Sequence, residues 1–187
     1  MRIGPITAFL GVMALACSNA VRAQTPPGMQ AAGGANTTLP EQLRPPEGET
    51  PVLRASAKGD QIYVCRAKAD GSGFEWALKA PDAVLRDEAG RQVATHYAGP
   101  TWQAEDGSKV VGQVAANVPA PGGQAIPWLL LKARSHEGWG RFAAVTHIQR
   151  LDTTGGLAPT TGCDAGHAGA EQRVPYTAVY AFYKAGG

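Results

Sequence analysis

The stretch "VPYTAVYAFYK" (residues 174–184) carries the clearest structural signal in this chain of 187 residues. Apolar and aromatic side chains stand at every second position. Because successive side chains of a β-strand point to opposite faces, this period of two predicts a strand with one face against a core. The residues on that face are Val174, Tyr176, Ala178, Tyr180 and Phe182.

Similar patterns recur along the chain, separated by turn signals. "DEAG" (87–90) and "EDGS" (105–108) each separate two such segments, and Asp-Gly is a strong signal for a β-hairpin. We expect about eight to ten strands and no amphipathic helix, which predicts an all-β fold, an antiparallel β-sandwich or barrel. The other segments are "QIYVCRA" (61–67), "GFEWALKAP" (73–81), "AVLRDEAGRQVATHY" (83–97), "GPTWQAEDGSKVVGQVAANV" (99–118) and "FAAVTHIQRLDT" (142–153). "AIPWLLLKAR" (125–134) is instead a continuous apolar run, which predicts a strand covered on both faces.

The first 23 residues have the organisation of a secretory signal peptide. Arg2 precedes an apolar run, and "VRA" (21–23) predicts cleavage after Ala23 and therefore export to the periplasm or the extracellular space. The run is shorter than the roughly 20 residues of a transmembrane helix, and we expect no transmembrane segment. An alternative is lipidation of Cys17, although a large aliphatic residue is missing three positions before it.

The remaining chain divides into a leader and one domain. Residues 24–50 are rich in Pro and Gly and have few large apolar side chains, so we expect a flexible leader. Residues 51–187 have the size of a single β domain.

Cleavage changes both the charge and the cysteine count. Loss of Arg2 and Arg22 reduces the 17 basic residues to 15, equal to the 15 acidic ones, so no excess of positive charge favours nucleic-acid binding. Of three cysteines, Cys65 and Cys163 remain. In an oxidising compartment they are expected to form a disulfide.

The familiar catalytic motifs are missing from the sequence. It contains no G-x-G-x-x-G after a strand, no Walker loop, no G-x-S-x-G and no H-E-x-x-H, which disfavours dinucleotide enzymes, P-loop enzymes, typical α/β-hydrolases and zincins. No catalytic residue and no cofactor is predicted. His96, His147 and His167 are metal-ligand candidates, but their spacing puts no two rings on one face, so a metal site requires tertiary convergence.

Aromatic residues offer a binding surface instead. Trp76 and Trp128 lie within apolar alternation and are expected in the core, whereas Trp139 in "HEGWGR" is expected to be exposed. "HYAGPTW" (96–102) is expected to be a strand-breaking corner, because Gly-Pro ends a strand, with a possible rim role for its histidine. The binding candidates are His96, Trp102, Trp139 and Arg150.

Seven motifs across residues 39–183 together resemble a known family. They are "LPEQLRPPEGETPV", "QIYVCRA", "HYAGPTW", "EDGSKVVG", "IPWLLLKAR", "IQRLDTTGGLAPTTGC" and "VPYTAVYAFY", in this order. The family comprises secreted bacterial and fungal proteins and is described only as a domain of unknown function (family number 3455). The resemblance implies an exported single domain with a cysteine pair, and it transfers no activity and no catalytic residue.

Three hypotheses about function remain. The first is an exported, non-enzymatic β-domain that binds a small molecule or a cell-envelope component. The second is a metal-dependent or oxidative enzyme that uses His96 and His147, with help from His167 or Asp164. The third is a structural protein of the envelope or matrix without a ligand. The oligomeric state does not follow from the sequence.

Overall fold

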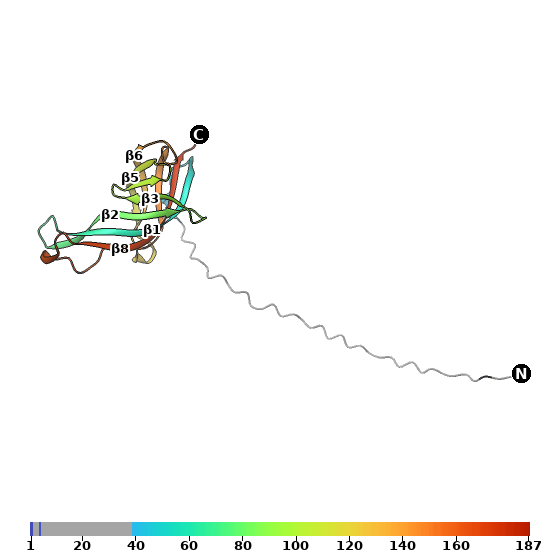
Figure 1. Ribbon diagram of the computed structural model, residues 1–187, viewed down its shortest axis with the longest axis horizontal. Helices are drawn as coiled ribbons and strands as arrows, with labels where there is room; N and C mark the ends of the chain where they lie inside the picture. The colour runs from blue at the N-terminus through green and yellow to red at the C-terminus, as the bar shows by residue number, and fades with distance from the viewer. Residues whose placement is uncertain (2–3, 5–38) are drawn as a thin grey trace. The chain divides into compact units, whose positions relative to one another are not determined.

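Eight antiparallel strands form one sheet that closes on itself (Figure 1). The computed structural model describes residues 1, 4 and 39–187, so the expected signal peptide and residues 24–38 of the expected leader lie outside the described residues. The all-β prediction is confirmed, and the closed ring is a barrel rather than a sandwich. The strands are β1 (Glu49–Ala67), β2 (Phe74–Arg86), β3 (Gln92–Tyr97), β4 (Thr101–Ala104), β5 (Lys109–Val118), β6 (Trp128–Glu137), β7 (Val145–Gly155) and β8 (Glu171–Ala185).

Each strand pairs with the next along the chain, and β8 pairs with β1 to close the ring. The two predicted turns, 87–90 and 105–108, join β2 to β3 and β4 to β5. Closure means that every strand has a paired neighbour on both sides over at least part of its length, so the sheet has no end strand. Three short 3-10 turns complete the structure: η1 (Glu41–Leu43), η2 (Pro121–Gly123) and η3 (Ala165–His167). No helix among the described residues is long and apolar enough to cross a membrane.

The inner face of the barrel holds the main core. The predicted face of β8 points inward, and Tyr176, Tyr180 and Phe182 are each at most 2 % exposed. Trp102 of β4 packs edge-on against Tyr180 and Phe182, with ring centroids 5.4 and 6.0 Å away. The part of the core between β4 and β8 is therefore largely aromatic.

A smaller cluster covers the outer face of β6 and β7. Trp128, Leu130 and Leu151 are buried there beneath Leu43 of η1, which is fully buried. The carbonyl oxygen of Leu43 accepts a hydrogen bond of 2.6 Å from Nε2 of Gln149. Leu39 and Leu43 thus pack on the barrel. The apolar run of 125–134 is covered on both faces at residues 128–131, which contribute to both clusters, whereas Lys132 and Arg134 are exposed.

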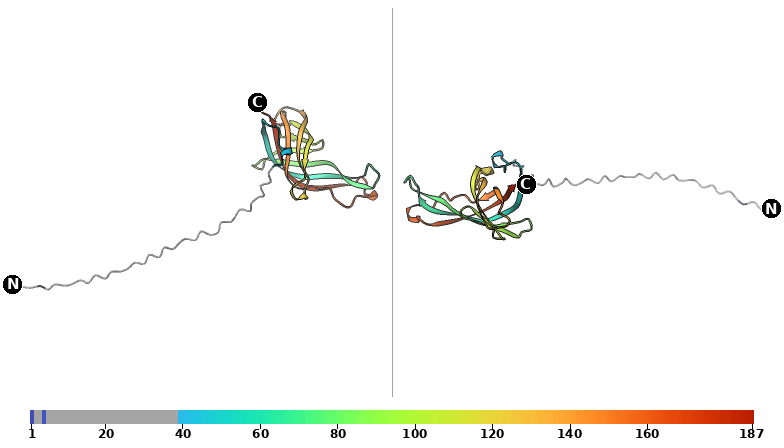
Figure 2. Two further views of the ribbon diagram at one scale, coloured as in Figure 1. Left: turned by 180° about the vertical axis from the view of Figure 1, so that it is seen from behind. Right: turned by 90° about the horizontal axis from the view of Figure 1, so that it is seen from above.

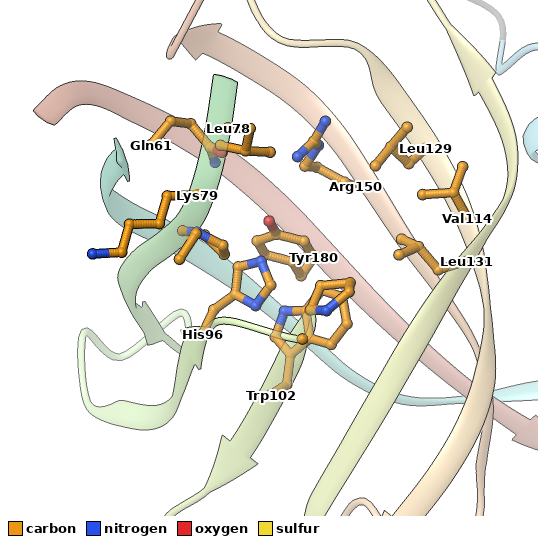
Figure 3. A pocket seen from close by; sticks show the side chains of 14 residues that line it. Gln61, Leu78, Lys79, His96, Trp102, Val114, Leu129, Leu131, Arg150 and Tyr180 are labelled. Atoms are coloured by element: carbon orange, nitrogen blue, oxygen red, sulfur yellow. The ribbon is translucent and has the colours of Figure 1, made fainter. Parts of the chain in front are cut away.

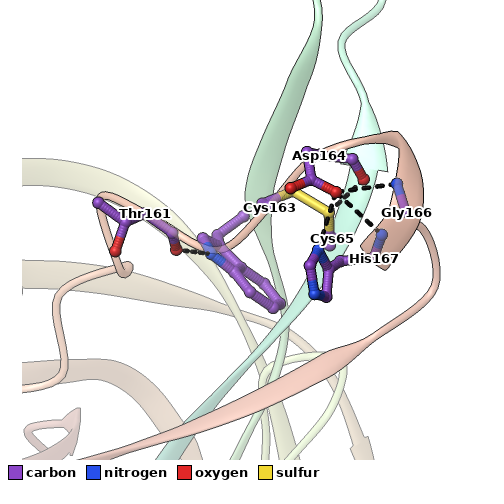
Figure 4. A network of polar contacts seen from close by, with 7 residues as sticks. Cys65, Thr161, Cys163, Asp164, Gly166 and His167 are labelled. Carbon is purple, nitrogen blue, oxygen red and sulfur yellow. Dashed lines mark hydrogen bonds and ion pairs between the residues drawn. A yellow bond between two sulfur atoms is a disulfide. The ribbon is translucent and has the colours of Figure 1, made fainter.

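Parts of β1, β2 and β8 extend beyond the barrel and form a three-stranded arm (Figures 1 and 2). The predicted disulfide joins Cys65 of β1 to Cys163 in the loop 156–170, with an S–S distance of 2.03 Å. Beside it, Oδ1 of Asp164 accepts hydrogen bonds from the backbone N–H of Gly166 and His167 and contacts Nδ1 of His167 at 2.8 Å (Figure 4).

The prediction that Trp76 lies in the core is wrong. Its side chain lies on the arm, only partly buried, and its Nε1 donates a hydrogen bond of 2.8 Å to the carbonyl oxygen of Thr161 in the tethered loop. The alternation around Trp76 belongs to the part of β2 that pairs with β1 but not with β3, where the side chain is only partly covered. Trp128, by contrast, is 6 % exposed, as expected.

Two short strands leave an opening in the barrel wall. The pairing of β2 with β3 ends at Ala83 and His96, and β3 and β4 then turn at residues 98–100. The last backbone bond between this turn and β5 runs from Gly112 N to Pro100 O, at 2.9 Å. Beyond it, residues 77–82 of β2 and 113–118 of β5 continue with no described strand paired between them. We call this opening the window.

Candidate functional site: a cavity behind the window

A cavity of about 320 Å³ lies behind the window (Figure 3). Sites for small organic molecules have volumes of about 300–1,000 Å³, so this cavity has room for a small ligand. Every strand of the barrel contributes to its lining. In strand order, these residues include Gln61, Leu78, His96, Trp102, Val114, Leu131, Arg150 and Tyr180.

One wall of the cavity is a stacked pair from the β3–β4 corner. His96 and Trp102 are cross-strand partners, and their rings stack with centroids 4.2 Å apart and an interplanar angle of 5°. Gly112 on the neighbouring strand makes room for the indole, because a Cβ there would lie 3.0 Å from Cζ3 of Trp102. The corner predicted from "HYAGPTW" is confirmed, and four of its residues also line the cavity: His96, Gly99, Pro100 and Trp102.

The geometry defines the protonation state of His96. Its Nδ1 lies 2.9 Å from the carbonyl oxygen of Thr101, and a carbonyl can only accept, so Nδ1 carries the proton. Burial lowers the pKa of His96 to about 3 against the opposing effect of this hydrogen bond, and the charge of Arg150 lowers it further. The ring is therefore neutral at physiological pH, and Nε2 has a lone pair that can accept a hydrogen bond.

Arg150 supplies a positive charge on the inner side of the barrel. Alternation along β7 places it on the same face as Ile148 of the main core. Its Nε and Nη2 donate hydrogen bonds of 3.1 and 2.9 Å to the carbonyl oxygen of Pro127, which holds the guanidinium in place. Burial raises the pKa of Tyr180, and the charge of Arg150 opposes that rise, so the phenol is neutral.

Two deeply buried donors in the lining have no protein partner. Gln61 is 2 % and Trp102 is 1 % exposed, and neither Nε2 of Gln61 nor Nε1 of Trp102 meets an acceptor within residues 39–187. An unsatisfied buried donor costs about 1–3 kcal/mol, so native proteins pair nearly all of them with protein, water or ligand. Glu49 Oε2 and Trp128 Nε1, the other two unpartnered atoms of the described part, do not belong to the cavity lining.

The mouth of the cavity is apolar and open to solvent. Leu78 on β2 and Val114 on β5 flank the window, and they are 56 % and 49 % exposed. Leu131 continues this apolar surface inward, as the close view shows (Figure 3). A ligand in the cavity would cover these side chains and gain the free energy of removing their surface from water.

A larger hollow, of about 500 Å³, lies on the outer surface. Its lining includes Ser56, Lys58, Arg86 and Thr177, which are exposed on the outer face of β1, β2 and β8. Neither of the two unpartnered donors of the inner cavity touches it. The cavity behind the window is therefore the stronger candidate for a binding site.

The structure brings together three of the four predicted binding residues, His96, Trp102 and Arg150, in this one cavity. The fourth, Trp139, lies between β6 and β7 with 94 % of its surface exposed and does not line it. Its predicted exposure is confirmed. Sequence reasoning missed Gln61, which follows Lys58, Gly59 and Asp60 in the sequence and so does not stand out as a buried polar residue.

The three candidate metal ligands lie in different places. His96 is inside the barrel, and His167 is bonded to Asp164 at the end of the arm. His147 points to the other face of β7, where its Nδ1 lies 2.7 Å from Oε1 of Glu49. Among residues 39–187 there is no group of three or more His, Cys, Asp or Glu side chains placed to hold a metal ion.

The comparison with protein families gives one match. A family described as "Protein of unknown function (DUF3455)" matches residues 45–184, which include the whole of β1 to β7 and all of β8 except its last residue. No curated protein and no solved structure matches the chain.

Proposed function

The chain belongs to the DUF3455 family, and for this member we propose the function of an exported, non-enzymatic binding protein that holds a small organic molecule behind the window of its barrel. The observation that carries the proposal is the pair of buried, unpartnered donors, on Gln61 and Trp102, in the lining of a cavity with an apolar mouth. Ordered water alone could satisfy the donors, but it would leave Leu78 and Val114 exposed.

Geometry favours binding over catalysis. The enzyme hypothesis requires His96 and His147 to act together, yet the first lies inside the barrel and the second pairs with Glu49 on the outer side of β7. His96 is held neutral by burial and fixed by Thr101, which suits a hydrogen-bond acceptor better than a group that changes its proton repeatedly.

A thermal-shift screen tests the binding function. The probes are small aromatic and aliphatic acids, amides and alcohols, together with monosaccharides and envelope fragments. A ligand present at 100 times its Kd should stabilise the native state by about 2.7 kcal/mol. Val114→Trp would place an indole in the mouth and should abolish the shift. Leu157→Trp is the matched control, because Leu157 is also exposed, at 42 %, but does not line the cavity.

The screen has two outcomes that would refute the proposal. One is the absence of any thermal shift across all probe classes. The other is an equal shift in wild type and Val114→Trp, which would place the ligand outside the window.

Export is part of the proposal and rests on residues 1–23, with support from the Cys65–Cys163 disulfide. Sequencing the N-terminus of protein purified from the periplasm or the medium tests it. We expect Gln24 as the first residue. A protein that begins at Cys17 would indicate the lipidated alternative, and an intact Met1 on protein retained in the cytoplasm would contradict export.

A further inference from the structure

The charges around the cavity restrict the chemistry of its ligand. Lys79 and Arg150 are the two charged residues in the lining, and both are basic. Lys79 is already neutralised by an ion pair with Glu171 on β8. Arg150 forms no ion pair with any residue in the described part of the chain. The lining therefore carries one positive charge that no protein carboxylate balances.

The neutral groups beside Arg150 do not supply the missing negative charge. Tyr180 is fully buried and His96 is 3 % exposed, and both are uncharged near pH 7. The unpartnered atoms of Gln61 and Trp102 are N–H donors, which also favour an electron-rich ligand atom. A partly buried cation without a counter-charge is costly, and a ligand anion would offset that cost.

We infer that the cavity selects small monocarboxylates with a compact apolar body. The carboxylate binds the guanidinium of Arg150, and the apolar body lies against Leu131, Leu78 and Val114 towards the window. This assignment rests on the proposed binding function and adds the ligand's charge. Arginine suits the task because its planar group can donate two hydrogen bonds to one carboxylate.

A pair of ligands that differ only in charge tests the inference. Calorimetric titration of the full mature protein at pH 7.5 would compare 3-phenylpropanoate with 3-phenylpropanamide, which have the same apolar body. A hydrogen bond to a charged group contributes about 1.5–3 kcal/mol, so the carboxylate should bind about 10-fold to 100-fold more tightly. 3-Phenylpropylamine should bind more weakly than the amide.

Variants assign the preference to one side chain. Arg150→Met should bring carboxylate affinity down to that of the amide, and Arg150→Lys, which keeps the charge, should retain part of the preference. Lys109→Met serves as the matched control, because it also removes a cation, one that is paired with Glu137 and does not line the cavity. It should leave the preference at the wild-type value.

The outcomes separate this inference from the function on which it rests. Equal affinity of wild type for acid and amide would overturn the inference and leave the binding function intact. Failure of all three probes to bind, together with an empty screen, would overturn both. A preference that persists in Arg150→Met, or disappears in Lys109→Met, would overturn the assignment to Arg150. The comparison of acid with amide needs no variant, so it decides the question even if Arg150→Met does not fold.

Discussion

Acid should destabilise the barrel through one buried histidine. His96 lies inside the barrel with 3 % of its surface exposed, stacked on Trp102 and bonded through Nδ1 to the carbonyl of Thr101. Protonation of its ring would bury a charge close to the guanidinium of Arg150. The native state therefore has a lower affinity for a proton at His96 than the unfolded state has.

The size of the effect follows from the two pKa values. The pKa of His96 is 6.5 in the unfolded chain and about 3 in the native state. Stability is fully present above pH 6.5 and is lost as the pH falls from 6.5 towards 3, because only the unfolded state binds the proton in this range. At pH 5.0 the loss amounts to about 2 kcal/mol, and it is nearly the same for any native pKa below about 4.

Urea unfolding of wild type and His96→Gln at pH 7.5 and 5.0 measures this loss. Glutamine does not titrate, and its amide can still donate to the carbonyl of Thr101. The two proteins differ only at residue 96, so the contributions of all other groups cancel in the difference. We expect wild type to lose about 2 kcal/mol more than the variant. Identical pH dependence of the two proteins would refute the assignment of a neutral, buried His96.

Three further changes test other parts of the account. Replacing Cys65 and Cys163 by serine should lower the free energy of unfolding by about 5 kcal/mol, because their separation is 98 residues; an unchanged urea midpoint would show that they are not bridged. Leu43→Ala should cost about 2–5 kcal/mol in the same assay, and a negligible loss would mean that Leu43 does not pack on the barrel. Gly112→Ala puts a methyl group 3.0 Å from Trp102 and should cost about 1–3 kcal/mol; wild-type stability would mean that the indole has room to move.

The strands could be predicted from local sequence, because alternation is a property of neighbouring residues. The pattern in 174–184 specifies which side chains of β8 face the core, and Tyr176, Tyr180 and Phe182 do so. The barrel itself could not be predicted, since a sandwich uses the same alternation and turns. Closure depends on the pairing of β1 with β8, whose residues stand more than 100 positions apart.

The candidate site could be predicted only in part. His96 and Trp102 stand in one short motif, so their proximity follows from the turn between them. Gln61, Leu78 and Val114 come from three other strands, and their meeting depends on the barrel register and on the early end of β3 and β4. The local sequence predicts the β3–β4 hairpin. It does not predict that the neighbouring strands β2 and β5 extend beyond the end of this hairpin.

The burial of Trp76 was mispredicted for a related reason. An alternating strand predicts two faces, but whether a second layer covers the apolar one depends on where the strand leaves the barrel. In β2 the residues before Ala83 pair with β1 alone, and Trp76 lies in that projecting part. The tethered loop 156–170, which accepts its hydrogen bond, is brought there by the disulfide.

The indole N–H resonances of the four tryptophans, followed by NMR during titration with 3-phenylpropanoate, show where a ligand binds. Single Trp→Phe variants assign the four signals. Trp102 lines the cavity and its Nε1 has no partner in the described chain, whereas Trp76, Trp128 and Trp139 do not line it. We predict that the Trp102 signal shifts in a saturable way while the other three stay in place. A saturable shift of Trp139 with no change at Trp102 would contradict binding behind the window.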